Sequence, residues 1–231
     1  MSEEAMDTSK DYRLLLVRDA VSRLERIVRV WNLNYPIHKN VVLQKLREAR
    51  RFSEEILHSY LPLSYLITYE PVTKLQDLGK ELAKLLLPPK GVSVSGKSKL
   101  HVAEIKYCLL QLINLKPKLA LGEENKPEYA VDIVGVEIAS VTKHPNASKL
   151  YVTKAGTAAF GLTIVTNIES VRKGEIRAAA ILPPREFFGV ISEAMFCSDP
   201  LPKEFLGKRP PQNLISSKEV ASAVEGIIRE R

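Results

Sequence analysis

The chain contains very little cysteine. Its 231 residues include only two, Cys108 and Cys197, far apart in the sequence. Neither belongs to a Cys-x-x-Cys pair or to a group of histidines and cysteines, which are the spacings typical of metal sites and redox pairs. We therefore expect two reduced, buried thiols, with no disulfide, no bound metal and no cofactor.

Long apolar segments are also missing. The longest apolar stretch, residues 60–69, is interrupted by Pro62. It is shorter than the roughly 20 residues that a membrane-spanning helix needs. The first ten residues are polar and acidic, unlike a signal peptide. These features predict a cytoplasmic protein that neither spans nor binds a membrane.

Catalytic constellations are absent as well, since no nucleophile–base pair and no paired carboxylates stand out. We therefore predict that the chain is not an enzyme. One segment, GVSVSGKS from Gly91 to Ser98, does match the spacing of a phosphate loop. A phosphate loop needs a buried strand before it, whereas the preceding segment has helical periodicity and ends at Pro88 and Pro89. A basic loop between helices is favoured, and nucleotide hydrolysis through Lys97 is the lesser alternative.

What the chain does have is the composition of a packed protein, with 45% hydrophobic and 26% charged residues. The formal net charge is +7, of which +5 lies in residues 1–128 and +2 in residues 129–231. A basic balance suits a polyanionic partner, because each neutralised phosphate releases counterions. The excess is modest and supports RNA binding only weakly.

The first half is typical of helices. Apolar residues recur every three or four positions and predict helices over 11–31, from Asn40 as N-cap to about residue 60, over 72–87 and over 100–115. The polar faces of the first two carry arginines: Arg13, Arg18, Arg23, Arg26, Arg29, Arg47, Arg50 and Arg51. They could contact RNA, or they could be solvated and paired with the acids interleaved among them.

The second half is typical of short strands. After a linker at 116–128, β-rich segments occur at 131–142, 150–155, 162–166 and 176–182, and a fifth strand contains Met195 and Phe196. Residues 216–231 predict a final helix. The fold class predicted is α+β, with a helical domain at 1–125 and a five-stranded OB-fold β-barrel with a C-terminal helix at 126–231.

Three segments carry a family resemblance: VGVEI at 134–138 followed by KHPNASKLYV at 143–152, then TIVTNI at 163–168, then GVISEAM at 189–195. Their order and spacing resemble the tRNA-binding domain of endothelial monocyte-activating polypeptide, some methionyl-tRNA synthetases and the phenylalanyl-tRNA synthetase beta subunit. The resemblance implies non-catalytic binding of tRNA or similar structured RNA. It further implies a homodimer, with aminoacyl-tRNA synthetases as possible partners.

The resemblance also indicates the RNA-contacting positions, and there the chain departs from the family. In the family, the signature strand, which leads into the segment that matches GVISEAM, carries an asparagine, two lysines and an arginine. This chain has Ile181, Pro183, Glu186 and Phe188 at those positions, whereas the serine of the family is kept as Ser192. Thr166 and Asn167 stand where the family has serine and glycine. With the nearby bases, the predicted nucleic-acid-binding residues are Lys149, Lys154, Thr166, Asn167, Arg172, Lys173, Arg185 and Ser192.

Other residues of these motifs have two interpretations. Phe187 and Phe188 could stack on unpaired bases, or one could pack inward while the other covers a neighbouring helix or subunit. His144 is expected to be a hydrogen-bonded turn histidine, and Gly135 and Gly189 suit strand bends or close backbone contacts. The loss of basic residues leaves an alternative function, a protein-interaction or dimerisation module whose RNA surface is degraded.

Overall fold

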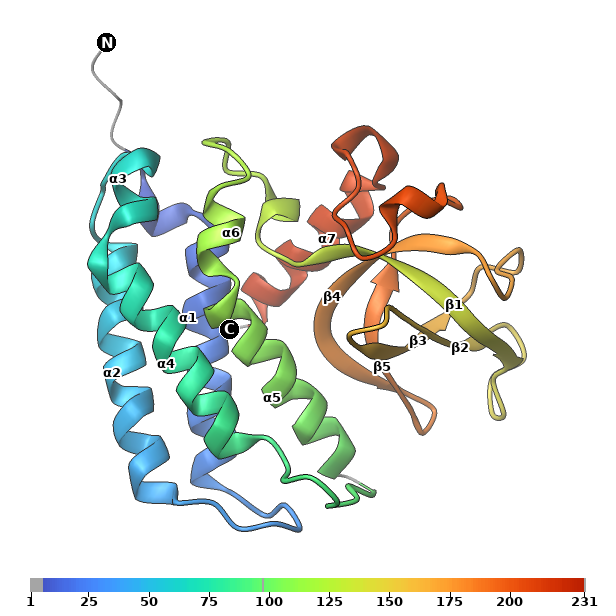
Figure 1. Cartoon of the computed structure of the whole chain (residues 1–231), viewed down its shortest axis with the longest axis horizontal. Coiled ribbons are helices and arrows are strands. Elements are labelled where there is room, and N and C mark those ends of the chain that lie inside the picture. The colour runs from blue at the N-terminus through green and yellow to red at the C-terminus, as the bar shows by residue number, and fades with distance from the viewer. Residues whose placement is uncertain (1–5, 97, 231) are drawn as a thin grey trace. The chain divides into compact units, whose positions relative to one another are not determined.

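The computed structural model describes residues 6–96 and 98–230 and divides into two compact units (Figure 1). The helical unit reaches Val131 and includes the residues from Val224 onward, and the barrel unit is Asp132–Ala223. The predicted boundary after residue 125 falls slightly earlier, and the predicted second domain included the last residues of the chain.

Four helices form the core of the helical unit: α1 (Tyr12–Arg29), α2 (Lys39–Leu57), α4 (Glu70–Leu86) and α5 (Ser98–Ile113). α1 and α4 each contact both α2 and α5, so the four apolar stripes enclose one interior. The four predicted helices are confirmed. Two short helices were not predicted: α3 (Leu63–Thr68), and α6 (Leu115–Leu119) at the start of the predicted linker. The N-cap prediction for Asn40 was wrong, because α2 begins at Lys39 with His38 as its N-cap.

Arg13 does not belong to a solvated face. It is 1% exposed and pairs with Asp11, with 2.7 Å between Arg13 Nη2 and Asp11 Oδ2. Its Nη1 also donates to the carbonyl oxygen of Gly122 at 2.8 Å. Asp11 accepts from the backbone N–H groups of Arg13 and Leu14 as the N-cap of α1. Helical periodicity alone placed Arg13 outside; the buried carboxylate and carbonyls explain why it lies inside.

Several of the other arginines pair with acids as the solvated interpretation expects. Arg23 Nε lies 2.7 Å from Asp19 Oδ2, and its Nη1 lies 3.2 Å from Glu104 Oε1. Arg50 Nη2 lies 2.7 Å from Glu25 Oε2. These pairs neutralise charges that would otherwise face a polyanion, which favours the solvated interpretation of the helix faces over an RNA surface.

The segment that matches a phosphate loop connects α4 to α5. It therefore follows a helix, and the described part of the helical unit contains no strand that could precede such a loop. Lys97, on which the nucleotide hypothesis depends, lies outside the described residues. The helix before the loop agrees with the interpretation as a connection between helices.

The barrel unit contains five strands: β1 (Ile133–Lys143), β2 (Tyr151–Gly156), β3 (Gly161–Thr166), β4 (Ile176–Phe187) and β5 (Val190–Phe196). They pair antiparallel in the order β3-β2-β1-β4-β5. The α+β class and the five strands are confirmed, although β4 runs five residues beyond its predicted end. The helix α7 (Ser217–Arg229) follows. None of the helices that the structure describes is long and apolar enough to cross a membrane.

The main-chain ladder does not close between β3 and β5, and side chains bridge these two edges instead. Val165 N–H donates to Ser192 Oγ at 3.0 Å, and Thr163 N–H donates to Glu193 Oε2 at 2.9 Å. Ser192 Oγ in turn donates to the carbonyl oxygen of Ala194 at 3.0 Å. The curved sheet thereby encloses a core that includes Val136, Ile138, Ile164, Val171, Ala179 and Phe196.

Gly135 marks a close backbone contact on β1. Its N–H donates to the carbonyl oxygen of Lys208, and its own carbonyl accepts from Gly207 N–H, both at 2.8 Å. A Cβ atom at this position would lie 2.1 Å from the carbonyl oxygen of Phe205. Only glycine permits this approach, as the sequence predicted, and it lets residues 205–208 pair with the side of β1 not occupied by β4.

Candidate nucleic-acid interface

Two motifs far apart in the sequence meet at one end of the barrel unit. His144 Nε2 donates to the carbonyl oxygen of Phe187 at 2.8 Å, and Asn146 Nδ2 donates to that of Phe188 at 3.1 Å. These bonds join the β1–β2 loop (residues 144–150) to the β4–β5 turn. We call this end, residues 143–151 and 185–190, the barrel tip.

The imidazole of His144 is held at both nitrogens. Its Nδ1 accepts from Asn146 N–H at 3.1 Å, so the proton on the ring must be on Nε2 for the bond to Phe187. The residue is only 4% exposed. The interpretation of His144 as a hydrogen-bonded turn residue is confirmed, and its bonding leaves neither ring nitrogen for chemistry.

The β4–β5 connection is a two-residue turn. Phe187 pairs with Val190, and the central residues Phe188 and Gly189 both have positive φ, 48° and 92°. This is the geometry of a type I′ turn, in which Asn-Gly is the favoured pair. Phe188 occupies the asparagine position and is 66% exposed. Phe187 is 37% exposed, so neither ring is packed in the core.

Basic side chains flank this turn. Lys143 and Lys149 are exposed and, within the described part of the chain, neither makes an ion pair. Lys143 pairs with Tyr151, which pairs with Thr166, so the three form a row across neighbouring strands. Arg185 is exposed on β4, two residues before Phe187.

Glu186 does not cancel the charge of Arg185. Arg185, Glu186 and Phe187 each pair in register with residues of β5. Successive side chains of a strand point to opposite faces, which puts Arg185 and Phe187 on one face and Glu186 on the other. The repulsion of phosphate expected from Glu186 is thus directed away from that face.

The two predicted hydroxyl contacts have roles inside the barrel. Ser192 is 6% exposed, and its hydroxyl bridges the β3 and β5 edges. Thr166 is 8% exposed, and its hydroxyl accepts from Ile168 N–H at 3.2 Å. Asn167, directly after β3, is exposed. We therefore assign Ser192 and Thr166 to the stability of the barrel and keep Asn167 as a candidate contact.

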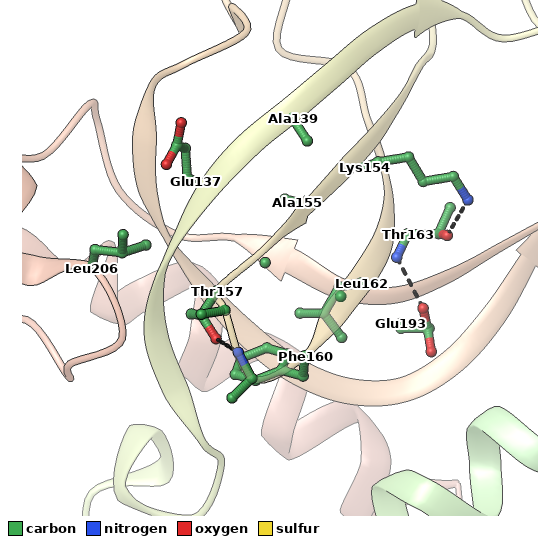
Figure 2. A pocket seen from close by; sticks show the side chains of 14 residues that line it. Glu137, Ala139, Lys154, Ala155, Thr157, Phe160, Leu162, Thr163, Glu193 and Leu206 are labelled. Atoms are coloured by element: carbon green, nitrogen blue, oxygen red, sulfur yellow. Dashed lines mark hydrogen bonds between the residues drawn. The ribbon is translucent and has the colours of Figure 1, made fainter. Parts of the chain in front are cut away.

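Lys154 lies in a separate groove of about 810 Å³ on β1, β2 and the β2–β3 turn (Figure 2). Its Nζ donates to Thr163 Oγ1 at 2.7 Å. Glu137 and Glu193 line the same groove, so its lining holds two carboxylates and one ammonium group. Small and apolar residues complete the lining, among them Phe160 and Leu206. The charge balance disfavours phosphate here.

Arg172 and Lys173 are exposed on the loop between β3 and β4. Arg172 Nη1 donates to the carbonyl oxygens of Glu169 and Val171 at 2.8 and 2.9 Å. The loop bonds to Ile138 in the middle of β1, through Gly174 N–H at 2.8 Å. Of the predicted residues, the structure thus brings Lys149 and Arg185 to the tip, whereas Lys154, Arg172 and Lys173 lie elsewhere.

Asn146 is a residue of the barrel tip that the sequence prediction missed. Its side chain reaches the carbonyl oxygen of Phe188, 42 residues away, which no local pattern indicates. The available signal was its place after His144-Pro145, since asparagine is typical of tight turns. Among the described residues, no group of histidine, cysteine, aspartate or glutamate could hold a metal ion.

Two protein families match the two parts of this chain. Residues 5–122 match a family described as "Alpha helical domain", and residues 133–214 match one described as "Putative tRNA binding domain". The crystal structure of a MetRS related protein from Pyrococcus horikoshii is similar at 18% identity, covering 38% of this chain and 88% of that chain, with a TM-score of 0.29. No curated protein matches the chain. The chain belongs to the Alpha helical domain family and carries a domain of the tRNA binding domain family after it.

Proposed function

We propose that this protein binds tRNA or tRNA-like structured RNA without catalysis, through the barrel tip. The observation that carries the proposal is the convergence of two family motifs at one end, where His144 and Asn146 hold the Phe187-Phe188 turn. Lys143, Lys149 and Arg185 provide exposed cations around it. The matched tRNA binding domain supports the same ligand class.

Recognition at this surface depends on the RNA backbone and its shape. Lysine and arginine contact phosphates, which carry no sequence information. Double-stranded RNA offers few base edges to side chains, so the shape of the RNA determines whether it is recognised. With Lys143 and Lys149 contacting phosphates at the tip, the logarithm of the binding constant should fall with the logarithm of the salt concentration with a slope of about −1.4 to −1.8.

The test is a titration of the full chain with bulk tRNA at low and at physiological salt. We expect binding that weakens steeply with salt and is lost in a Lys143→Ala/Lys149→Ala variant. The matched control is Lys173→Ala, which removes an exposed charge from the loop between β3 and β4. If the chain does not bind tRNA at low salt, the proposed function is rejected. Equal losses in the tip variant and the control reject the tip as the site.

The groove of Figure 2 favours a second candidate function, self-association of the barrel unit. Phe160 and Leu206 are 38% and 37% exposed beside Glu137 and Glu193. The acidic balance of the groove complements the chain as a whole, whose net charge is +7. We propose that a second copy of this chain occupies it. Occupation of the groove by a second copy would produce the homodimer that the family resemblance implies. The predicted synthetase partners and the predicted cytoplasmic location stay predictions.

Sedimentation equilibrium tests the second candidate. The wild-type chain should be a dimer, and Phe160→Ser should shift it toward the monomer. Phe188→Ser, which removes an exposed ring from the tip, is the matched control and should leave the dimer intact. A wild-type protein that is monomeric at every concentration rejects this use of the groove.

A further inference from the structure

We infer that Phe188 is a stacking platform for an unpaired RNA base, so that the preferred ligand is RNA with a single-stranded loop. The inference rests on the proposed function, because it assigns a specific contact to the barrel tip. It concerns a residue at which this chain differs from the family pattern, where an arginine is expected.

The backbone of Phe188 is the first observation. Its φ of +48° lies in the left-handed region, which is unfavourable for a bulky side chain and easy for asparagine or glycine. Turn geometry therefore does not account for a phenylalanine here. Strained residues that persist are held by their surroundings and concentrate at binding sites.

Packing does not account for the side chain either. Phe188 is the most exposed of the aromatic residues that the structure describes, at 66%. Its ring meets the His144 ring in a T-shaped contact with 6.1 Å between centroids and 78° between planes. This contact orients the ring but leaves most of it open to solvent.

The surroundings hold Phe188 in place before any ligand arrives. The carbonyl oxygen of Phe187 accepts from His144, and that of Phe188 accepts from Asn146. The donors come from the β1–β2 loop, so the turn is tied to a second segment of the barrel. A rigid aromatic platform loses little conformational freedom on binding, which favours affinity.

The chemistry around the ring selects the ligand. An exposed aromatic ring between basic side chains suits single-stranded nucleic acid, because bases stack on the ring while lysines contact phosphates. Lys149 lies in the same loop as Asn146, and Lys143 directly precedes His144. A paired duplex keeps its bases stacked inside and offers Phe188 no free base.

The experiment compares a stem–loop RNA with a duplex of the same stem, using the full chain. Phe188→Asn should weaken stem–loop binding about 5- to 150-fold, the range expected for one stacked base. Binding of the duplex should not change. Phe188→Trp should retain stem–loop binding. Tyr65→Asn, which alters an aromatic residue that is 62% exposed in the helical unit, is the matched control and should behave as wild type.

Two further readouts separate the possible results. Phe188→Asn should unfold at the same temperature as wild type or higher, which shows that lost binding is not lost folding. A 2-aminopurine in the RNA loop should be quenched by wild type and not by Phe188→Asn. If Phe188→Asn binds the stem–loop as tightly as wild type does, stacking is rejected and RNA binding stands. If wild type binds neither RNA, the proposed function itself fails.

Discussion

His144 Nε2 lies 2.8 Å from the carbonyl oxygen of Phe187, across a separation of 43 residues. This hydrogen bond holds the β1–β2 loop against the β4–β5 turn. Its donor is a buried ring whose other nitrogen is bonded to Asn146 N–H. The geometry of the proposed RNA contact therefore depends on a residue that does not itself face the solvent.

Replacing His144 by alanine should destabilise the barrel. The Phe187 carbonyl and the Asn146 N–H both lose a partner in a partly buried setting, and the loss of the two hydrogen bonds should cost about 1–3 kcal/mol. Urea denaturation of the full chain measures the change. His58→Ala is the control, because that side chain is 56% exposed in the helical unit, and it should have little effect. Equal stability of His144→Ala and wild type would show that the bond contributes nothing.

Ser192→Ala should reduce stability and leave RNA affinity unchanged. The substitution removes the acceptor of Val165 N–H and weakens the bridge between β3 and β5. The expected cost is about 1–3 kcal/mol. tRNA binding by the folded variant, measured at a temperature well below its unfolding midpoint, distinguishes the two roles. A loss of binding without a loss of stability would restore Ser192 to the RNA surface.

Two glycine substitutions should separate a steric effect from a conformational one. Gly135→Ala forces a Cβ atom against the Phe205 carbonyl oxygen and should cost about 1–3 kcal/mol or more. Gly189→Ala meets no atom within 4 Å but has φ of +92°, so it should cost about 1 kcal/mol. Thermal unfolding of both variants gives the comparison. The contact at Gly135 is unimportant if Gly135→Ala proves the milder change.

The two cysteines should be unreactive in the folded protein. Burial raises the pKa of the Cys197 thiol to about 12 and that of the Cys108 thiol well above its ordinary value. Only the thiolate reacts with a disulfide reagent. At pH 8 we expect neither thiol to react within minutes, and both to react in denaturant. Rapid labelling of the native chain at pH 8 contradicts this burial.

The same raised pKa predicts how stability depends on pH. Below about pH 8.5 Cys197 is protonated in the folded and the unfolded chain. Above that pH the unfolded chain ionises first, so stability falls until the folded thiol also ionises near pH 12. Cys197→Ser should show a smaller fall between these limits. An identical pH profile in the variant argues against a contribution from this thiol.

Local patterns accounted for the elements because they depend on neighbours in the sequence. Periodicity predicted the four long helices, and alternating apolar residues bounded by glycine, proline or asparagine predicted five strands. The glycine at position 135 predicted either a strand bend or a close backbone contact, and the structure shows the contact. The pattern failed at Arg13, because its guanidinium bonds to Asp11 and also to carbonyl oxygens more than a hundred residues away, at Lys118, Leu119 and Gly122.

The residues of the candidate site were harder to predict than the fold. The sequence determined that Ser192 and Phe188 belong to the signature strand and its turn, but not which of them faces solvent. Strand register and sheet closure decided that: Ser192 turns inward to satisfy an edge N–H, and Phe188 stays outside in a strained turn. Exposure and hydrogen bonding are set by long-range contacts, and those contacts exist only once β3 and β5 have met.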